Sequence, residues 1–343
     1  MKAIALGLAA FSIAAQAAGL DCPEAKTLEA LVACIARQMP QERSNGYRAP
    51  DETARAQFRG VYRRMLAGEC DFALPPALAG VMQLRSFKDE GNGRMYCVLM
   101  EVRDDDGDGH VDRGWGTFVT YDKATNETNH SAPHPIYDEG TEGQAVAIFR
   151  DSDARSFMMC GAHRRAHGLL GGRCEPKYGI ADCAHQDDTL FQAAVMEMAD
   201  GYGAKPWTHV QWHGNTTCEP VAVYASQGFA KPQPADSPLR KLRASMAAHQ
   251  PQVKPFELTG EGSTCIFNAT ENVAGRFLNG SRDVCDKPGE AASGRFAHIE
   301  QIRGLRDPAL WIESVRETWG PRRRRRSAAT ARNRGASSSS AFP

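Results

Sequence analysis

The segment "NHSAPHPIYDEG", residues 129–140, contains side chains that could bind a metal ion. His134 lies between two prolines, and Asp138 and Glu139 follow it in the same loop. Histidine nitrogens and carboxylate oxygens are common protein ligands of catalytic zinc, which usually has three protein ligands and one position open to water. A loop that supplies His134 and one of the two acids therefore needs a third ligand from another part of the chain.

Three apolar segments, each predicted to be a strand, lead directly into polar side chains. "RSFMMCGA" leads into Arg164 and Arg165, "WTHVQW" into His213, and "RFAHI" into Glu300. In α/β sheets, ligands bind beyond the carboxyl ends of the strands, so these side chains are expected at one edge with His134. His213 is then the third metal ligand, and Glu300 is placed to act as a general base. Arg164 or Arg165 is expected to bind a substrate carboxylate or to stabilise an oxyanion.

Alternatives for the ligands stay open. Glu139 could replace Asp138, because neighbouring loop residues usually point in different directions. His185, in "DCAHQDDTLF", precedes a predicted helix and is the main rival among the histidines. His130 is expected at the surface, although it lies four residues before His134 and could replace it as a ligand.

The elements that position these residues are expected to form an α/β fold. Three apolar segments within residues 81–121, separated by Gly, Asp and Asn turns, predict an N-terminal β-meander. After residue 140, helices alternate with strands, which is typical of a mixed, mainly parallel sheet flanked by helices. Thr141 is the predicted N-cap of the helix after the His134 loop. The helices are predicted at 27–39, 51–68, 141–151, 187–203, 237–250, 272–280 and 307–319, and the later strands at 155–162, 207–214, 220–226 and 294–302.

The order of these motifs resembles that of the zinc carboxypeptidases and of their amidohydrolase relatives, the N-formylglutamate amidohydrolases and poly-γ-glutamate hydrolases. "APHPIYD" resembles the loop of the first two zinc ligands, which implies His134 and Asp138, and "VQWHG" resembles the strand of the third, which implies His213. "RFAHIEQI" resembles the strand of the catalytic glutamate, here Glu300, and "GAHRR" resembles the segment of the substrate-binding arginine. The resemblance covers residues 128–320 and implies a zinc carboxypeptidase-like fold. The chain departs from it by offering HxxxD or HxxxxE in place of HxxE, and by its N-terminal third, which suggests an added subdomain or a lid.

A second group of acids lies in "DDDGDGHVD", residues 104–112. Asp104, Asp106, Asp108 and Asp112 fall at positions 1, 3, 5 and 9 of a calcium loop. Position 12 is Trp115 instead of the usual glutamate, and Asp-Gly is also an ordinary hairpin turn. Because four carboxylates in one turn repel one another unless a cation neutralises them, structural Ca²⁺ is the favoured interpretation.

The N-terminus and the cysteines indicate an exported protein. Residues 1–17 are predicted to be a cleaved signal peptide, with a basic start, a short apolar stretch and a small-residue "AQA" site. The ten cysteines lack the paired CxxC spacing of a zinc module, which favours disulfides. Local pairs are the simplest expectation, and Cys160 could remain a buried free thiol. The expected pairs are Cys22–Cys34, Cys174–Cys183 and Cys265–Cys285.

The chain is expected to have four parts: the signal peptide, an N-terminal helical segment (18–75), a catalytic domain (76–320) that includes the meander, and a disordered Arg/Ser-rich tail (321–343). The tail has seven arginines and no acid, so the body is net acidic although the formal charge is zero. No nucleic-acid partner and no membrane span are expected, and the tail has no part in the core function.

The sequence therefore predicts a secreted or periplasmic, zinc-dependent hydrolase that cleaves an amide bond with metal-activated water and Glu300 as general base. The expected substrate is peptide-like or bears a carboxylate, such as an N-acyl amino acid, a γ-glutamyl polymer or a cell-wall peptide. One alternative is a secreted, calcium-stabilised binding protein without catalysis. Another is a hydrolase-like fold that binds no metal.

Overall fold

A mixed sheet of nine strands runs through the part of the chain that the structure describes, residues 20–263 and 265–321. The structure is a computed structural model. The strand order is β1-β2-β3-β5-β4-β6-β9-β7-β8. The central strands β5, β4, β6 and β9 are parallel, whereas the meander β1–β3 joins β5 through antiparallel pairs. The predicted mixed α/β class is confirmed, and the meander extends the sheet instead of forming a lid. The strands are β1 (Met82–Lys88), β2 (Met95–Glu101), β3 (Thr117–Thr120), β4 (Asn126–Ala132), β5 (Ala154–Met159), β6 (Thr208–Gly214), β7 (Val223–Ser226), β8 (Phe256–Leu258) and β9 (Phe296–Gln301).

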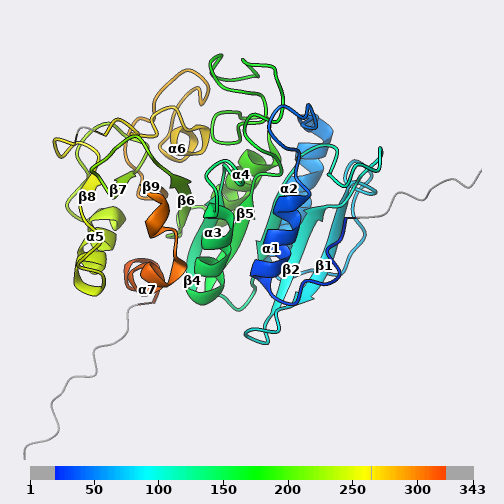
Figure 1. The fold of residues 1–343 in the computed structure, drawn as a ribbon, viewed down its shortest axis with the longest axis horizontal. Coiled ribbons are helices and arrows are strands. Elements are labelled where there is room, and N and C mark those ends of the chain that lie inside the picture. The colour runs from blue at the N-terminus through cyan, green and yellow to red at the C-terminus, as the bar shows by residue number, and fades with distance from the viewer. Residues whose placement is uncertain (1–19, 264, 322–343) are drawn as a thin grey trace, which may run out of the picture.

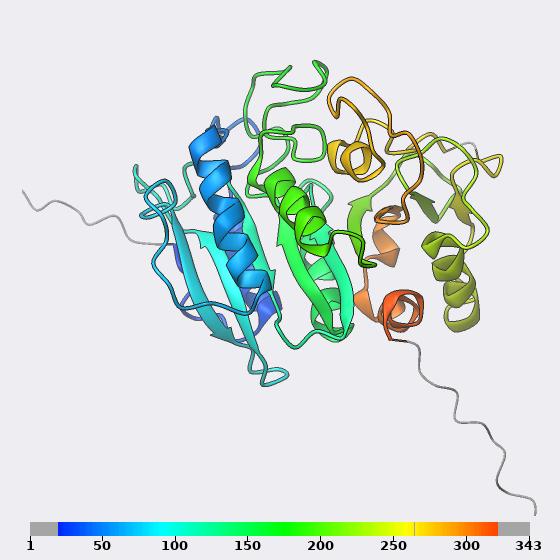
Figure 2. The ribbon, with the colours of Figure 1, turned by 180° about the vertical axis from the view of Figure 1, so that it is seen from behind.

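Helices cover both faces of this sheet. Helices α1, α3, α5 and α7 pack on the face seen in Figure 1. Helices α2, α4 and α6 pack on the other face, which is seen in Figure 2. Strand β2 shows the cause: Val98 and Met100 enter one core and Cys97 and Leu99 the other, because successive side chains point to opposite faces. The helices are α1 (Leu28–Arg37), α2 (Glu52–Leu66), α3 (Thr141–Asp151), α4 (Leu190–Tyr202), α5 (Pro238–His249), α6 (Val273–Leu278) and α7 (Ile312–Trp319).

The predicted helices are confirmed, with two corrections at their ends. The segment predicted as one helix, residues 307–319, is divided into a short 3-10 helix (Pro308–Leu310) and helix α7, which begins at Ile312. Helix α3 begins at Thr141, so its N-cap is Gly140, which has a φ of 87° and no capping side chain, and the prediction of Thr141 as N-cap was wrong. The turn from Asp138 into the helix, closed by the N–H of Thr141 on the carbonyl of Asp138 (3.1 Å), uses the left-handed backbone that glycine adopts most readily.

Strand β4 was not predicted, because its sequence "NETNHSA" is polar and yet lies at the centre of the sheet. Its buried side chains have partners: Asn129 Nδ2 donates to Ser156 Oγ (2.9 Å), and Ser131 Oγ donates to the carbonyl of Val210 (3.0 Å). His130 accepts a hydrogen bond from Trp212 Nε1 (3.2 Å). His130 is fully buried, so its expected place at the surface was wrong.

Five disulfides join the ten cysteines. Cys22–Cys34 is confirmed, whereas the other two predicted pairs and the free thiol of Cys160 were wrong. Pairing by nearness in sequence fails here because residues 160–188 contact two different elements: Cys183 reaches the end of β5, and Cys174 reaches the segment after α6. The remaining disulfides are Cys70–Cys97, Cys160–Cys183, Cys174–Cys285 and Cys218–Cys265.

The predicted signal peptide (1–17) and all but the first residue of the predicted tail (321–343) lie outside the described residues. Within the described part, every helix is too short or too polar to cross a membrane. The long segments after β5 and after β8 lie together at the top of Figure 1. They cover the edge of the sheet at which the predicted site residues meet.

Candidate functional site

The predicted site residues meet at one edge of the central parallel strands. His134 follows β4, Arg164 follows β5, and His213 and Glu300 lie near the ends of β6 and β9, where they are direct partners in the strand register. These side chains and Asp138 line one cavity of about 670 Å³. The sheet topology thus places residues from four distant segments around a single space.

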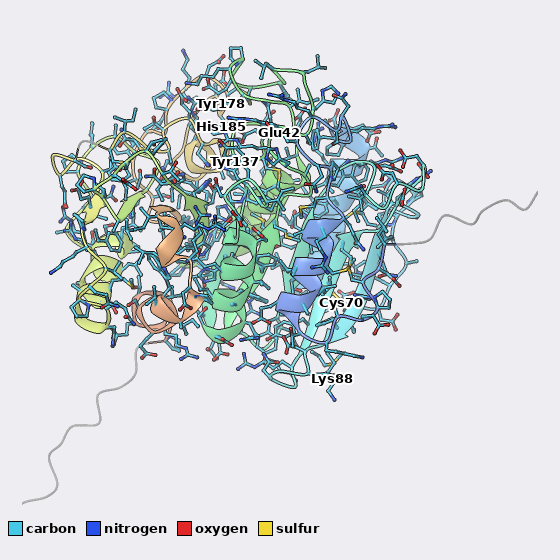
Figure 3. The ribbon with its side chains drawn as sticks, viewed as in Figure 1. Glu42, Cys70, Lys88, Tyr137, Tyr178 and His185 are labelled. Carbon is cyan, nitrogen blue, oxygen red and sulfur yellow. A yellow bond between two sulfur atoms is a disulfide. The ribbon has the colours of Figure 1, made fainter. Side chains whose placement is uncertain are left out.

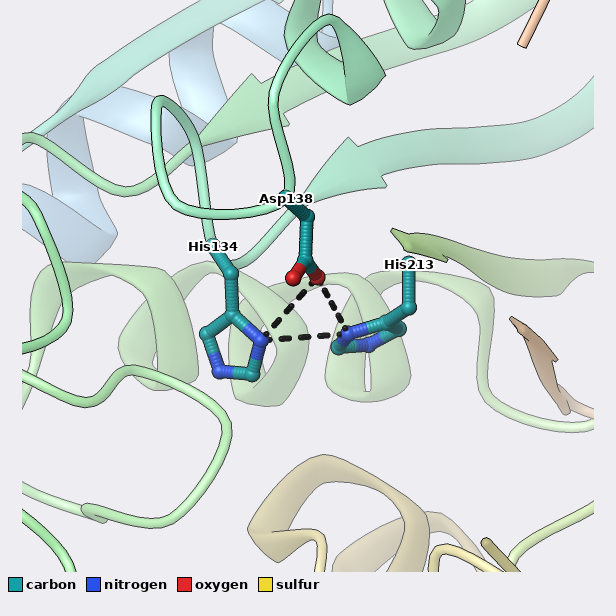
Figure 4. A group of neighbouring side chains, drawn as sticks. All are labelled: His134, Asp138 and His213. Atoms are coloured by element: carbon teal, nitrogen blue, oxygen red, sulfur yellow. Dashed lines mark hydrogen bonds and ion pairs between the residues drawn. The ribbon is translucent and has the colours of Figure 1, made fainter. Parts of the chain in front are cut away.

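Three of these residues form a close group (Figure 4). His134 Nδ1 lies 3.3 Å from Asp138 Oδ2 and 3.2 Å from His213 Nδ1. His213 Nδ1 lies 3.2 Å from the same Asp138 oxygen. All three side chains are buried. With zinc–nitrogen bonds of about 2.05 Å, two ligands of a tetrahedral zinc lie ~3.3 Å apart, so this triangle has the size of one face of a zinc site.

The loop between the two first members is held by a tight turn. The Asp138 N–H donates to the carbonyl of His134 (2.9 Å), which brings the two side chains to the same side. Ile136 within this turn has a φ of 57°, and a β-branched residue rarely adopts such a backbone. Glu139 points away: its side chain is 65% exposed and pairs with Arg303 (2.6 Å). Asp138, not Glu139, therefore faces the histidines.

Further hydrogen bonds decide which imidazole nitrogen carries the proton. The Nε2–H of His134 donates to Asp182 Oδ1 (3.0 Å), and the Nε2–H of His213 donates to Gln211 Oε1 (3.3 Å). Since a neutral imidazole has a single N–H, both Nδ1 atoms then present lone pairs. These lone pairs and the Asp138 oxygen face one another at 3.2–3.3 Å. Arg164 Nη1, 3.3 Å from His134 Nδ1, can donate to the first lone pair, but among the described residues no such donor lies between His213 Nδ1 and the Asp138 oxygen, and that contact is repulsive unless a cation lies beside it. The residues present therefore fit a metal ion.

A buried chain of amides and imidazoles fixes the orientation of Gln211. Its Oε1 also accepts from Asn272 Nδ2 (2.7 Å), and its Nε2 donates to His209 Nε2 (3.0 Å). The Nδ1–H of His209 in turn donates to Asn129 Oδ1 (2.7 Å). Because each amide is held at both ends, Gln211 presents its oxygen, not its nitrogen, to His213.

Without a cation, a proton on His134 can relieve the group. Burial and Arg164 lower the pKa of His134, but Asp182 and Asp138 raise it more, and the net shift is upward. Burial alone would raise the pKa of Asp138, but the neighbouring side chains of His134 and His213 hold it well below its usual range. Burial lowers the pKa of His213 to about 4. A metal ion bound at this group would thus compete with a proton for His134.

Two neighbouring groups of possible ligands share residues with this one, and the first of them is satisfied without a metal. Asp182 Oδ1 accepts from His134 Nε2 (3.0 Å) and from His185 Nδ1 (2.9 Å), so this group is an ordinary set of donors around an acceptor. His185 also stacks on Tyr178, with ring centroids 3.5 Å apart. His213 lies near His298 and Glu300 as well; its Nε2 is engaged with Gln211, and His298 Nδ1 is buried without a partner among the described residues. In the His134–Asp138–His213 group, two acceptors, His213 Nδ1 and Asp138 Oδ2, face each other directly at 3.2 Å.

Glu300 lies beside this group, and its surroundings shift its pKa upward. It is buried, and His298 Nε2 is 3.4 Å from its Oε1. Burial and the charge of Asp138 raise the pKa of Glu300 well above its usual range, whereas Arg164 and Arg306 oppose this rise. A cation at the histidines would oppose the Asp138 charge and favour the ionised base.

The two predicted arginines have different places. Arg164 Nη1 lies 3.3 Å from His134 Nδ1, and its Nη2 pairs with Asp182, so its guanidinium is next to the His134–Asp138–His213 group. Arg165 is 60% exposed and reaches Tyr137 Oη (3.3 Å) outside the cavity wall. Of the two, only Arg164 can act on a molecule in the cavity.

The mouth of the cavity is bridged by contacts between its covering segments. Lys177 and Tyr178 both bind Glu271, at 2.7 and 2.8 Å. Arg164 lies over the rings of Tyr137 (5.1 Å) and Tyr178 (5.9 Å). Figure 3 shows both tyrosines with His185 above the sheet.

Sequence reasoning missed Asp182, Gln211 and Arg306, which also belong to the site. Gln211 could have been found because it lies two residues before His213 and so shares its strand face. Arg306 lies six residues beyond Glu300, past the strand end. No local pattern marked Asp182, because its partners come from distant segments.

The acidic loop is separate from this site. Oxygens of Asp104, Asp106 and Asp108 lie within 4.8 Å of one another. Asp112 instead accepts from the N–H of Asp105 (2.7 Å), and Asp104 accepts from Gly107 N–H (2.7 Å). Three of the four predicted acids therefore gather.

Comparisons with known proteins add little to this description. No protein-family model matches the chain, and no curated protein matches its sequence. A solved structure of a succinylglutamate desuccinalase from Vibrio parahaemolyticus is similar, at 11% identity and a TM-score of 0.36, over 69% of this chain and 77% of that chain. A metallo-carboxypeptidase from Burkholderia cenocepacia is similar at 11% identity and a TM-score of 0.30, over 79% of this chain and 68% of that chain. Similarity at this level defines no family, so the function is argued from the residues of this chain.

Proposed function

We propose that the protein is a zinc-dependent hydrolase that cleaves an amide bond, with His134, Asp138 and His213 as the zinc ligands. The observation that carries this proposal is the set of three lone pairs that face one another at 3.2–3.3 Å. Two histidines and a carboxylate are a common ligand set of catalytic zinc, and they leave a fourth position open. The cavity beside them has the size of a small-molecule site.

When bound, zinc supplies Lewis-acid chemistry, which polarises the scissile carbonyl and makes water a better nucleophile at neutral pH. Glu300 takes a proton from the attacking water as the C–O bond forms. The C–N bond then breaks, and Glu300 returns the proton to the leaving nitrogen, so the products are a carboxylate and an amine. Arg164, next to His134 Nδ1, stabilises the negative charge that develops on the carbonyl oxygen.

Export from the cytosol is part of this proposal. Five disulfides are typical of proteins that fold in an oxidising compartment. The predicted signal peptide agrees with such a route.

Zinc content and amide hydrolysis test the proposal together. The purified protein is expected to hold one zinc per chain, and His134→Ala and His213→Ala should lose it. His249→Ala is the matched control, because His249 lies on α5, away from the cavity, and pairs with Glu317. Glu300→Gln should keep zinc but lose about 10²–10⁴-fold in the rate of hydrolysis of N-acyl amino acids, γ-glutamyl amides or dipeptides. Protein without zinc, or zinc that stays after both histidine substitutions, would contradict the assignment.

A further inference from the structure

Several arginines lie around the cavity, and most of them already have carboxylate partners. Arg164 pairs with Asp182, and Arg303 pairs with Glu139. Arg306 also lines the cavity, but among the described residues no carboxylate oxygen lies within 4.0 Å of its nitrogens. Its positive charge is therefore available to a bound molecule.

The guanidinium of Arg306 is held in position by neighbouring backbone. Its Nη1 donates to the carbonyl of Glu139, and its Nε is buried without a partner among the described residues. It lies against Gly214, where a Cβ atom would collide with Nη2 and Cζ of Arg306. The glycine that directly follows the proposed ligand His213 thus gives the guanidinium its place on the cavity wall.

The same cavity has an apolar wall. Ile266 and Phe267 line it and are 80% and 37% exposed, respectively. Large apolar side chains beside an open cavity are typical of sites that bind apolar groups. The cavity therefore presents three features to the same molecule: the proposed zinc ligands, the guanidinium of Arg306, and an apolar surface.

We propose that Arg306 binds a free carboxylate of the substrate and thereby selects amides of amino acids with an apolar side chain. This inference rests on the proposed function for the reaction at the metal group. Arg306, and not Arg164 or Arg165, is then the carboxylate anchor. Arg164 is held beside His134 by its ion pair with Asp182, where it can stabilise the charge that develops on the carbonyl oxygen.

Binding of a simple probe tests the anchor apart from catalysis. The probes are N-acetyl-L-phenylalanine and its amide, titrated by calorimetry into full-length protein treated with a chelator, so that the carboxylate cannot bind zinc. Wild-type protein is expected to bind the acid about 10- to 100-fold more tightly than the amide. Arg306→Gln should lose this preference, Arg306→Lys should keep part of it, and the control Arg303→Gln should keep it fully.

Each outcome separates the anchor from a structural role and from the reaction. If Arg306 only held the loop at Glu139, Arg306→Gln would lower the melting temperature or zinc affinity but leave the acid-to-amide ratio unchanged, which overturns the proposal. A wild-type protein without the preference also overturns it. An Arg306-dependent preference in a protein that hydrolyses no amide supports the anchor and contradicts the proposed reaction. If the protein hydrolyses amides but Arg306→Gln leaves the KM for substrates with a free carboxylate unchanged, the result supports the proposed reaction and contradicts the anchor.

Discussion

Asp138 contacts Nδ1 of His134, and Asp182 contacts Nε2. Replacing each acid in turn tests which of the two nitrogens binds the proposed zinc ion. Asp138→Asn would change one of three direct ligands. If each ligand supplies about a third of the ~10–16 kcal/mol measured for structural zinc sites, this loss is about 3–5 kcal/mol, or roughly 10²–10⁴-fold in zinc affinity. Asp182→Asn would leave the ligands in place and change only the partner of His134 Nε2 at 3.0 Å. Such outer partners are typically worth 10- to 100-fold, or about 1.4–2.7 kcal/mol.

The assay is competition for zinc with a chromophoric chelator, with zinc per chain measured in parallel. Glu271→Gln is the control, because Glu271 lines the same cavity but binds Lys177 and Tyr178 instead of a histidine. Asp182→Asn also deprives Arg164 of its partner, so the unfolding of each metal-free variant must be compared first. The reasoning fails if Asp182→Asn abolishes zinc binding while Asp138→Asn weakens it only tenfold. The metal would then lie with His185, and Glu300 would be on the wrong side of His134 to act on it.

Three further predictions concern the surroundings of the site. Gln211→Leu removes the acceptor of His213 Nε2 and should weaken zinc binding about 10- to 100-fold in the chelator competition, whereas Gln211→Glu keeps an acceptor and should bind nearly as well. Burial lowers the pKa of His130 and of His209 to about 3, so the folded state stays neutral while the unfolded chain takes up protons below pH ~6.5. Each of these two histidines should therefore lower the free energy of unfolding by about 1.4 kcal/mol per pH unit as the pH falls from ~6.5. Urea unfolding of metal-free protein at pH 7.5 and 5.5 measures this loss, and His209→Gln should make the loss between the two pH values smaller. Calcium at 10 mM should stabilise the protein by about 1–3 kcal/mol in thermal melts, with no such effect on Asp106→Asn; an equal effect on both would exclude the acidic loop.

Much of the architecture could be predicted because its local patterns agree with the fold. The helices have apolar stripes and side-chain caps, such as Asp51 before α2 and Thr189 before α4. Most strands are apolar because both faces of the sheet are covered. Strand β4 could not be predicted, since its polar side chains are compensated by partners on β5 and β6 that no local window contains.

For the site, too, the residues at strand ends could be predicted from the sequence, whereas contacts between distant segments could not. His134, Asp138, His213 and Glu300 could be proposed, because strand ends of a parallel sheet meet at one edge. The choice of Asp138 over Glu139 needed the turn geometry, which sequence spacing does not supply. The residues that fix the protons of the histidines could not be predicted, because their role depends on which nitrogen each one meets.

The disulfide between Cys160 and Cys183 has a consequence for the maturation of the protein. The two cysteines are 23 residues apart, and the ring they close contains both Arg164 and Asp182. A newly made chain with free thiols lacks this ring, so the neighbours that orient His134 are not yet covalently tied to the end of β5. Formation of this disulfide therefore fixes the spacing between Arg164, Asp182 and the end of β5, and we expect the reduced chain to bind the proposed zinc ion more weakly than the oxidised chain.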